Sequence, residues 1–343
     1  MNSLKSKTNK RRIKPVVITM GDAAGIGPEI IVKLFARKGI SAKYWPVVIG
    51  DLIPMLDAQR RTSRKVSIRP VKSINEARFE EGIIDLIDMK CLKQGDYFLG
   101  EPSAAAGRAS YEYIKEAVKL CAAKKAGAMV TAPITKKTLH MAGLDYPGHT
   151  EIIAKMTKAK KHAMMLLTGD FRVVLVTIHT AFKNVPKLLT VKNIFEAIII
   201  THESLKKDFG IKNPRIAVPG LNPHAGESGA FGREEKLLIE PAIKHAKKEG
   251  INVQGPFPPD TIFHKVVKTK SHDAVVCMYH DQGLIPLKLI GFEKGVNTTL
   301  GLPIVRTSPD HGTAYDIAGT GAASDESLYS ALCTASIIKS NRT

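Results

Sequence analysis

Short, continuous runs of apolar residues alternate along the chain with longer segments in which apolar residues recur every three or four positions. The runs show no alternation of apolar and polar residues, which is typical of strands covered on both faces in mostly parallel sheets. The longer segments have the period of helices that cover such sheets. The pattern therefore predicts an α/β fold. Strands are expected within 16–20, 45–51, 126–135, 172–180, 215–227 and 273–283, and helices within 110–125, 191–209 and 234–250.

Single residues indicate where helices begin, break and end. Pro28 suits the first position of a helix, and Glu29 complements the positive end of the helix dipole. Ser110 is predicted to cap the helix that follows it, and Gly210 to end the next predicted helix. Pro241 predicts a break in the third, because proline cannot donate the hydrogen bond that a helix interior needs.

Polar residues directly follow five of the apolar runs. In open α/β sheets, ligands bind beyond the carboxyl ends of the strands, where the loops gather. We therefore expect five segments that are far apart in the sequence to converge on one cleft. These segments are Met20–Asp22, Thr131–Pro133, Ile178–Thr180, Leu221–His224 and Tyr279–Asp281.

The length of 343 residues favours two domains, because a single hydrophobic core stops growing at roughly 250 to 300 residues. No apolar run approaches the ~18 residues of a membrane span, so no membrane partner is expected. Residues 1–13 are predicted to be a disordered basic tail, since the apolar stretch of a signal peptide does not follow them. The four cysteines form no CxxC pair, which favours reduced thiols and a cytoplasmic location.

The net charge of +19 favours an anionic ligand, either a phosphorylated metabolite or a nucleic acid. Only 6% of the residues are aromatic, and no nucleic-acid-binding signature occurs. The lysines are also scattered along the predicted helices instead of forming one stripe. A metabolite is therefore the expected partner, and no nucleic acid is expected.

His179, His224 and His280 differ from the other histidines because each follows a predicted strand. Three neutral imidazoles with an open fourth position are typical of a catalytic site for a divalent metal. The wide spacing of the three residues matches no local metal-binding motif, so ordinary hydrogen-bonded histidines remain the alternative.

Two glycine-containing segments are candidates for anion binding. The segment GDAAGIGPE at 21–29 lacks the G-x-G-x-x-G spacing of a dinucleotide-binding turn, which leaves either a phosphate near the helix N-terminus or a plain turn. The segment at 300–321 combines charged residues with four glycines, and a loop of this length is more often functional than a simple connection. Within it, Arg306 suits bidentate capture of a phosphate or carboxylate, and Lys288 and Asn297 lie shortly upstream.

Six segments, in order between about residues 15 and 335, together resemble one family. They are TMGDAAGIGPE, GHTE, GLNPHAGESGAFGREE, GPFPPDTIF, YHDQGLIPLK and GVNTTLGLPIVRTSPDHGTAYDIAGTG. On these motifs the chain resembles the 4-hydroxythreonine-4-phosphate dehydrogenases of vitamin B6 biosynthesis. The segment HGTAYDIAGTG is also similar to the cofactor-binding loop of isopropylmalate and isocitrate dehydrogenases. The family usually has proline where this chain has Ala23.

The resemblance implies two α/β/α domains with mostly parallel sheets and an active-site cleft between them. The first domain would comprise residues 14–135 plus 295–343 and carry the cofactor loop. The second would comprise residues 136–294 and carry the metal ligands and the dimer interface. The resemblance further implies a homodimer in which the partner subunit completes the active site.

The activity implied is that of an oxidoreductase that uses NAD or NADP and one divalent metal ion, which is zinc, magnesium or cobalt. It would oxidise 4-phosphohydroxy-L-threonine to 2-amino-3-oxo-4-phosphooxybutanoate, which decarboxylates to 3-amino-2-oxopropyl phosphate. A paralogous branch oxidises 4-phospho-D-threonate or 4-phospho-D-erythronate in sugar-acid catabolism, and that activity is the alternative.

Residue roles carry over by matching motif. The implied metal ligands are His179, His224 and His280. The implied catalytic residues are Lys288, Asp281 and Asp260. The implied substrate contacts are His149, Thr150, Lys288, Asn297 and Arg306, although a helix cap is the safer interpretation of Thr150 by itself. The implied cofactor contacts are His311, Gly312, Thr313 and Asp316.

Two other classes of protein are separated from this prediction by simple tests. A phosphate acyltransferase shares the general architecture but needs no metal triad, and it would keep its activity in a chelator. A nucleic-acid-binding protein would show binding that falls steeply with salt.

Overall fold

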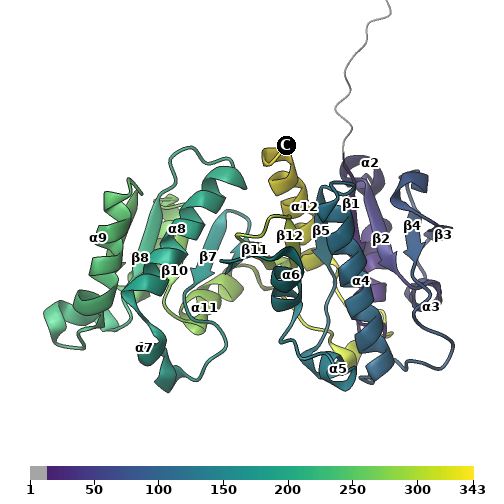
Figure 1. Ribbon diagram of the computed structural model, residues 1–343, viewed down its shortest axis with the longest axis horizontal. Coiled ribbons are helices and arrows are strands. Elements are labelled where there is room, and N and C mark those ends of the chain that lie inside the picture. Colours follow the sequence, from purple (N-terminus) through teal and green to yellow (C-terminus); the bar gives the residue numbers. More distant parts are fainter. Residues whose placement is uncertain (1–13) are drawn as a thin grey trace, which may run out of the picture.

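The computed structural model describes residues 14–343, so the predicted disordered tail at 1–13 lies outside the described residues. The molecule is elongated, and its strands join into one twelve-stranded sheet along the long axis (Figure 1). The α/β class predicted from the apolar runs is confirmed. The described strands are β1 Val16–Thr19, β2 Pro46–Gly50, β3 Ser67–Val71, β4 Ile83–Asp88, β5 Ala128–Thr131, β6 Ala163–Thr168, β7 Phe171–Leu175, β8 Ile216–Pro219, β9 Val253–Phe257, β10 Ala274–Cys277, β11 Val296–Leu300 and β12 Arg306–Pro309.

The order of strands is β3-β4-β2-β1-β5-β12-β11-β6-β7-β10-β8-β9. Neighbours are parallel at both ends of this order, and the antiparallel pairs β12-β11, β11-β6 and β6-β7 lie in the middle. Of the strands in these pairs the apolar runs predicted only β7, within 172–180, and they predicted no antiparallel pairing. The antiparallel strands join the two parallel parts into a continuous sheet, because β11 pairs with β12 on one side and with β6 on the other.

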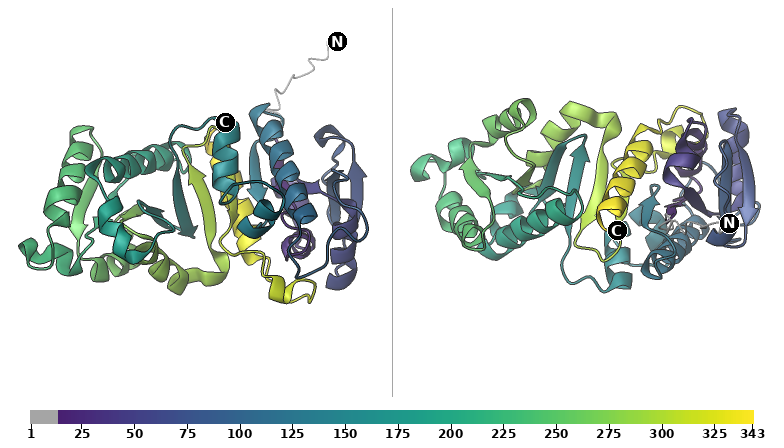
Figure 2. Two further views of the ribbon diagram at one scale, coloured as in Figure 1. Left: turned by 60° about the horizontal axis from the view of Figure 1, so that its bottom comes forward. Right: turned by 90° about the horizontal axis from the view of Figure 1, so that it is seen from above.

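Helices cover both faces of the sheet (Figure 2). They are α1 Gly27–Phe35, α2 Ile40–Tyr44, α3 Leu52–Thr62, α4 Ala104–Ala122, α5 Lys136–Met141, α6 His149–Thr157, α7 Val185–Leu188, α8 Val191–Lys207, α9 Glu240–Lys248, α10 Pro259–Thr269, α11 His280–Gly291 and α12 Glu326–Asn341. Short 3-10 turns occupy Ile74–Glu76, Phe182–Asn184, Pro223–Gly229, Phe292–Lys294 and Tyr315–Ile317, and a π-helical turn occupies Glu235–Ile239.

The C-terminal part of the chain returns to the middle of the molecule. Figure 1 shows β11, β12 and α12, in yellow-green and yellow, between the purple-to-blue first part and the green middle part. The strand β12 pairs with β5, and α12 packs against both β5 and β12. Segments separated by more than a hundred residues therefore meet at the centre of the sheet.

Several helix boundaries differ from the predictions. The helix predicted from Ser110 begins at Ala104, where the Ser103 hydroxyl accepts a hydrogen bond from the Ala106 amide at 3.1 Å. Ser110 lies inside the helix, and its hydroxyl is satisfied by the carbonyls of Gly21 and Ala106. The predicted break at Pro241 was wrong, because the π-helical turn Glu235–Ile239 passes directly into α9, and Pro241 is tolerated in the first turn of that α-helix.

Two other predictions about helix ends also differ from the structure. The helix predicted over 191–209 ends at Lys207 and begins with a capping box between Thr190 and Asn193. Thr150 is the second residue of α6, whose N-cap position is Gly148, so the capping role proposed for Thr150 was wrong. No helix in residues 14–343 is long and apolar enough to cross a membrane.

Candidate active site

A cleft of about 870 Å³ opens in the middle of the molecule. It lies where β5, β12 and β11 meet β6, and the first turns of α5, α6 and α11 also contribute to it. Its lining is rich in charged and imidazole side chains. These are Lys136, His149, Glu151, His179, His280, Lys288, Arg306, Asp310 and His311.

Most of the predicted site residues line this cleft. Those that do are His149, Thr150, His179, His280, Lys288, Asn297, Arg306, His311 and Gly312. Those that lie outside its lining are His224, Asp260, Asp281, Thr313 and Asp316. The convergence expected from the strand ends therefore occurs for three of the five segments, and the segments Met20–Asp22 and Leu221–His224 are the exceptions.

Arg306 supplies a buried positive charge at the wall of the cleft. It is 3% exposed and begins β12. Its guanidinium donates hydrogen bonds to the Thr131 hydroxyl at 2.9 and 3.2 Å and to the Thr299 hydroxyl at 3.3 Å. No carboxylate of the described residues forms an ion pair with it, and burial lowers the pKa of Arg306 to about 10. Such a charge is a ready site for a phosphate or carboxylate.

His149 stands beside this arginine at the start of α6. Burial, followed by the positive charge of Arg306, holds the pKa of His149 well below its usual value of 6.5. Its Nε2 atom is buried and has no partner in the described part of the chain. A neutral imidazole with a free nitrogen can donate to, or accept from, a substrate oxygen in the cleft.

We expect the imidazole of His149 to remain neutral between about pH 8 and 6. Its ring-proton resonance should therefore not move over that range, whereas the resonances of exposed histidines should. Because the unfolded chain binds this proton more readily than the folded one, stability should fall as pH falls below about 6.5. Replacing Arg306 by methionine should raise the pKa of His149. An unshifted His149 pKa in that variant would show that the two side chains do not interact.

His179 and His280 are neighbours in the cleft. Their ring centroids lie 5.6 Å apart. His280 is the first residue of α11, and its Nδ1 atom forms a 2.7 Å hydrogen bond with the Asp281 carboxylate. This contact fixes the ring and leaves Nε2 free, which is the arrangement that second-sphere carboxylates give to metal-binding histidines. Asp281 thus contacts a predicted ligand rather than lining the cleft.

His224 lies elsewhere on its own chain. It is exposed in the turn Pro223–Gly229, with a left-handed backbone at φ 51°. The buried carboxylate of Glu235 holds this turn by accepting hydrogen bonds from the amides of Leu221 and Asn222 at 2.8 and 2.7 Å. Within residues 14–343 no three His, Cys, Asp or Glu side chains gather closely enough to hold a metal ion. The chain alone brings together two of the three predicted ligands.

Asp260 belongs to the same region as His224. It is an exposed residue in the first turn of α10, and α10 packs against the Pro223–Gly229 turn. Two residues that the resemblance assigns to one active site therefore lie on elements that pack against each other, and neither lines the cleft of its own chain.

The structure adds residues that the sequence did not single out for a role. Lys136, Glu151 and Asp310 line the cleft, and burial raises the pKa of Asp310 while the charges of Lys288, His311 and His280 oppose that rise. Lys136 directly follows the loop after β5, which was a detectable signal. Nothing in the local sequence marks Glu235, because its role depends on a turn thirteen to fourteen residues earlier.

The fold is of the α/β class with a polar cleft in the middle of the sheet, and comparison with known proteins defines the family. Residues 42–335 match the family described as pyridoxal phosphate biosynthetic protein PdxA. The 4-hydroxythreonine-4-phosphate dehydrogenase of Geobacter metallireducens is 48% identical over 93% of this chain and 94% of the relative. The D-threonate 4-phosphate dehydrogenase of Salmonella typhimurium is 45% identical over 92% of this chain and 96% of the relative.

Solved structures agree with this assignment. The 4-hydroxythreonine-4-phosphate dehydrogenase of Klebsiella pneumoniae superposes with a TM-score of 0.87 at 40% identity, covering 96% of this chain and 99% of that one. The predicted oxidoreductase class is confirmed by the dehydrogenase relatives. The chain belongs to the PdxA family.

Proposed function

We propose that this chain oxidises the secondary alcohol of 4-phosphohydroxy-L-threonine with NAD or NADP and a divalent metal, and that the oxidised product decarboxylates to 3-amino-2-oxopropyl phosphate. The observation that carries the proposal is the buried guanidinium of Arg306, which faces the cleft without a carboxylate partner among residues 14–343. A phosphorylated hydroxy acid supplies the anion that this charge requires.

The chain's own residues would bind and orient this substrate. Arg306 would hold a charged end of the substrate, with His149, Thr150 and Asn297 as neutral partners around it. Thr150 lies 3.5 Å from Thr299, which also contacts Arg306, and the Oδ1 atom of Asn297 is buried without a partner in the described residues. These fixed groups would place the reacting carbon against the nicotinamide, so that hydride transfer becomes effectively intramolecular.

The residues present fit a metal through their donor chemistry. His179 and His280 offer two imidazoles at one place, and Asp281 orients one of them. A divalent cation bound there would supply Lewis acidity to the oxygen that becomes negative during oxidation and decarboxylation. Lys288 would add positive charge at the same wall of the cleft, and the choice of zinc, magnesium or cobalt depends on what these ligands bind in the cell.

We further propose that a second copy of the chain supplies His224 and Asp260 to this cleft. Both residues are exposed, lie on elements that pack against each other, and are absent from the lining of the cleft of their own chain. An exposed apolar surface on α11 and the following turn, formed by Ile285, Leu289 and Phe292, is suited to association, and Leu289 is 86% exposed. A homodimer with shared sites accounts for these features together.

The proposed division into domains follows the path of the chain. Residues 14–135 and 295–343 would form the first domain, with the cofactor contacts His311, Gly312, Thr313 and Asp316. Residues 136–294 would form the second domain, with the metal ligands and the dimer interface. Support comes from the sheet, where strands β1 to β5 lie on the β12 side of the central pair β12-β11 and strands β6 to β10 lie on the β11 side.

A paired-substrate assay tests the proposed reaction. Formation of reduced nicotinamide should be followed with 4-phosphohydroxy-L-threonine and with 4-phospho-D-threonate, each with and without added metal. We expect the phosphohydroxythreonine to give the higher kcat/KM and a chelator to abolish turnover. A higher kcat/KM for the phospho-threonate would favour the second candidate, to which the Salmonella relative's name points. Absence of any reduction of NAD or NADP would contradict the proposal.

A further inference from the structure

The turn between β1 and α1, with the sequence GDAAGIGPE at residues 21–29, has no part in the proposed reaction. Every residue of this turn is buried. The amide of Ile26 at the start of α1 donates a 3.0 Å hydrogen bond to the carbonyl of Thr313. A phosphate at this helix N-terminus, one of the two possibilities left open by the sequence, would need amides that face a ligand. The turn instead faces another part of the chain.

That other part is the segment 310–324, which we call the 310–324 loop and which contains the proposed cofactor contacts. Gly25 lies so close to it that a Cβ atom there would stand 2.8 Å from the carbonyl oxygen of Thr313. Gly21, at φ 75°, is fitted with equal closeness against the backbone of Pro133. The glycines of the motif therefore allow backbone to approach backbone, and the approach brings the 310–324 loop onto the turn.

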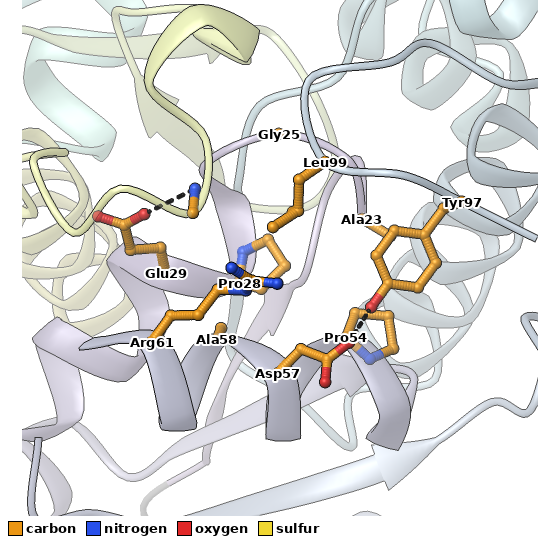
Figure 3. Close-up of a pocket in the computed structure, with 11 residues that line it drawn as sticks. Ala23, Gly25, Pro28, Glu29, Pro54, Asp57, Ala58, Arg61, Tyr97 and Leu99 are labelled. Carbon is orange, nitrogen blue, oxygen red and sulfur yellow. Dashed lines mark hydrogen bonds between the residues drawn. The ribbon is translucent and has the colours of Figure 1, made fainter. Parts of the chain in front are cut away.

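Glu29 forms hydrogen bonds with the C-terminal part of the loop. It is 3% exposed, and its two carboxylate oxygens accept hydrogen bonds from the amides of Gly319 and Ala323, each at 3.2 Å. Figure 3 shows Glu29 beside the small pocket between α1, α3 and the loop. Lys33, one helical turn later, forms a 3.1 Å ion pair with Glu29 and donates to the carbonyls of Gly321 and Ala323.

Asp22 forms a hydrogen bond with the middle of the loop, at Tyr315. Its side chain is fully buried. One carboxylate oxygen accepts from the Ala24 amide at 2.9 Å, and the other accepts from the hydroxyl of Tyr315 at 2.8 Å. Tyr315 stands directly before Asp316 in the loop. Two buried carboxylates thus hold the loop at points on either side of Asp316.

We propose that Asp22 and Glu29 are positioning residues that hold the 310–324 loop in the conformation that binds the nicotinamide cofactor. The turn formed by GDAAGIGPE is then the surface on which this loop packs, and it binds no phosphate itself. The inference rests on the proposed function, because it takes the loop to be the cofactor site. Loss of these hydrogen bonds lowers the fraction of molecules whose loop is in the binding conformation. The apparent cofactor affinity falls in proportion to that fraction.

The test compares Glu29→Gln and Tyr315→Phe with Arg37→Gln. The first removes one of the two acceptors on Glu29, and the second removes only the hydroxyl that reaches Asp22. Arg37→Gln is the matched control, because Arg37, two residues after α1, also binds the chain after the loop, through 2.6 Å hydrogen bonds to Asp325 and Glu326, and forms no hydrogen bond with the loop itself. It should lower the melting temperature without changing cofactor affinity.

We expect Glu29→Gln and Tyr315→Phe each to raise the KM for NAD or NADP about tenfold while kcat and the substrate KM change little. Amide hydrogen exchange in 310–324 should become faster in both variants without any ligand, and should stay unchanged in Arg37→Gln. Asp22→Asn, whose amide can still bond Tyr315, should behave as wild type, whereas Asp22→Ala should resemble Tyr315→Phe.

Two results would overturn the inference. Unchanged exchange in both loop variants would show that the carboxylates do not hold the loop. Faster exchange with an unchanged cofactor KM would show that the loop's conformation does not set cofactor affinity. If the wild-type protein uses no nicotinamide cofactor, the proposed function and the positioning role both fail, and the exchange data alone then decide whether the turn seats the loop. Tyr315→Phe keeps the test valid if Glu29→Gln does not fold, because it removes one oxygen atom only.

Discussion

Subunits with His224→Ala and subunits with His280→Ala are each expected to be inactive, and a mixture of the two is expected to regain about a quarter of the wild-type activity. Random exchange makes about half of the dimers mixed, and each mixed dimer keeps one intact site of two when His224 reaches across to the partner's cleft. The reason is geometric, since His224 is exposed and lies outside the cleft that holds His179 and His280.

The pure variants should lose bound metal and about three orders of magnitude in kcat/KM. This corresponds to roughly 4 kcal/mol of transition-state stabilisation, a magnitude typical of losing a charged catalytic group. Neither substitution should unfold the chain, because both rings sit at the ends of loops or helices and neither belongs to the core. Metal content and circular dichroism of each pure variant check these two points.

The control is a mixture of His179→Ala and His280→Ala subunits. These two rings lie 5.6 Å apart in one cleft, so every site of every dimer lacks one of them and no activity should return. Recovery in this control, or none in the His224 and His280 mixture, would contradict a site shared between subunits. A full complement of metal and activity in pure His224→Ala would remove His224 from the ligand set altogether.

The sequence predicted best those parts of the fold that bury uniform apolar surface. The runs at β1, β5 and β10 are buried along their whole length, and their strands are parallel as expected. The pair β11 and β12 escaped prediction because its polar residues are buried too. The hydroxyl of Thr298 donates to the carbonyl of Arg306, and the guanidinium of Arg306 donates to Thr299. Polar groups that satisfy one another inside a sheet do not show in a pattern of apolar residues.

The candidate site was predictable to the extent that strand ends converge. His280 begins α11 directly after β10 and lies beside the cleft, where a parallel sheet gathers its loops. His224 could not be placed from the sequence, because its orientation depends on a turn held by Glu235 from a later helix. The role of Glu29 could not be predicted from the sequence either. As a helix-dipole residue it would be exposed, and only the folded loop shows that its carboxylate binds two distant amides.

Replacing Arg306 by methionine is expected to make the protein more stable and much less active. The buried guanidinium bonds only to hydroxyl groups, and burial lowers its pKa to about 10, below its usual value. Between these two values the unfolded chain binds the proton more tightly, so stability rises with pH there and the cost of the buried charge persists at neutral pH. Methionine removes that cost, and the melting temperature in a buffer free of sulfate and phosphate should rise.

The same substitution should lower kcat/KM about 10²-fold or more, or roughly 3 kcal/mol, because the substrate anion loses its charged partner in a buried place. Sulfate should raise the melting temperature of the wild-type protein more than that of the variant, since only the wild type retains the anion site. Arg342→Met is the matched control. Its guanidinium pairs with the buried carboxylate of Asp208 at 2.6 and 2.9 Å, so its loss should destabilise the protein. If Arg306→Met is less stable than wild type and keeps its full response to sulfate, the charge of Arg306 is structural and the anion of the substrate binds elsewhere.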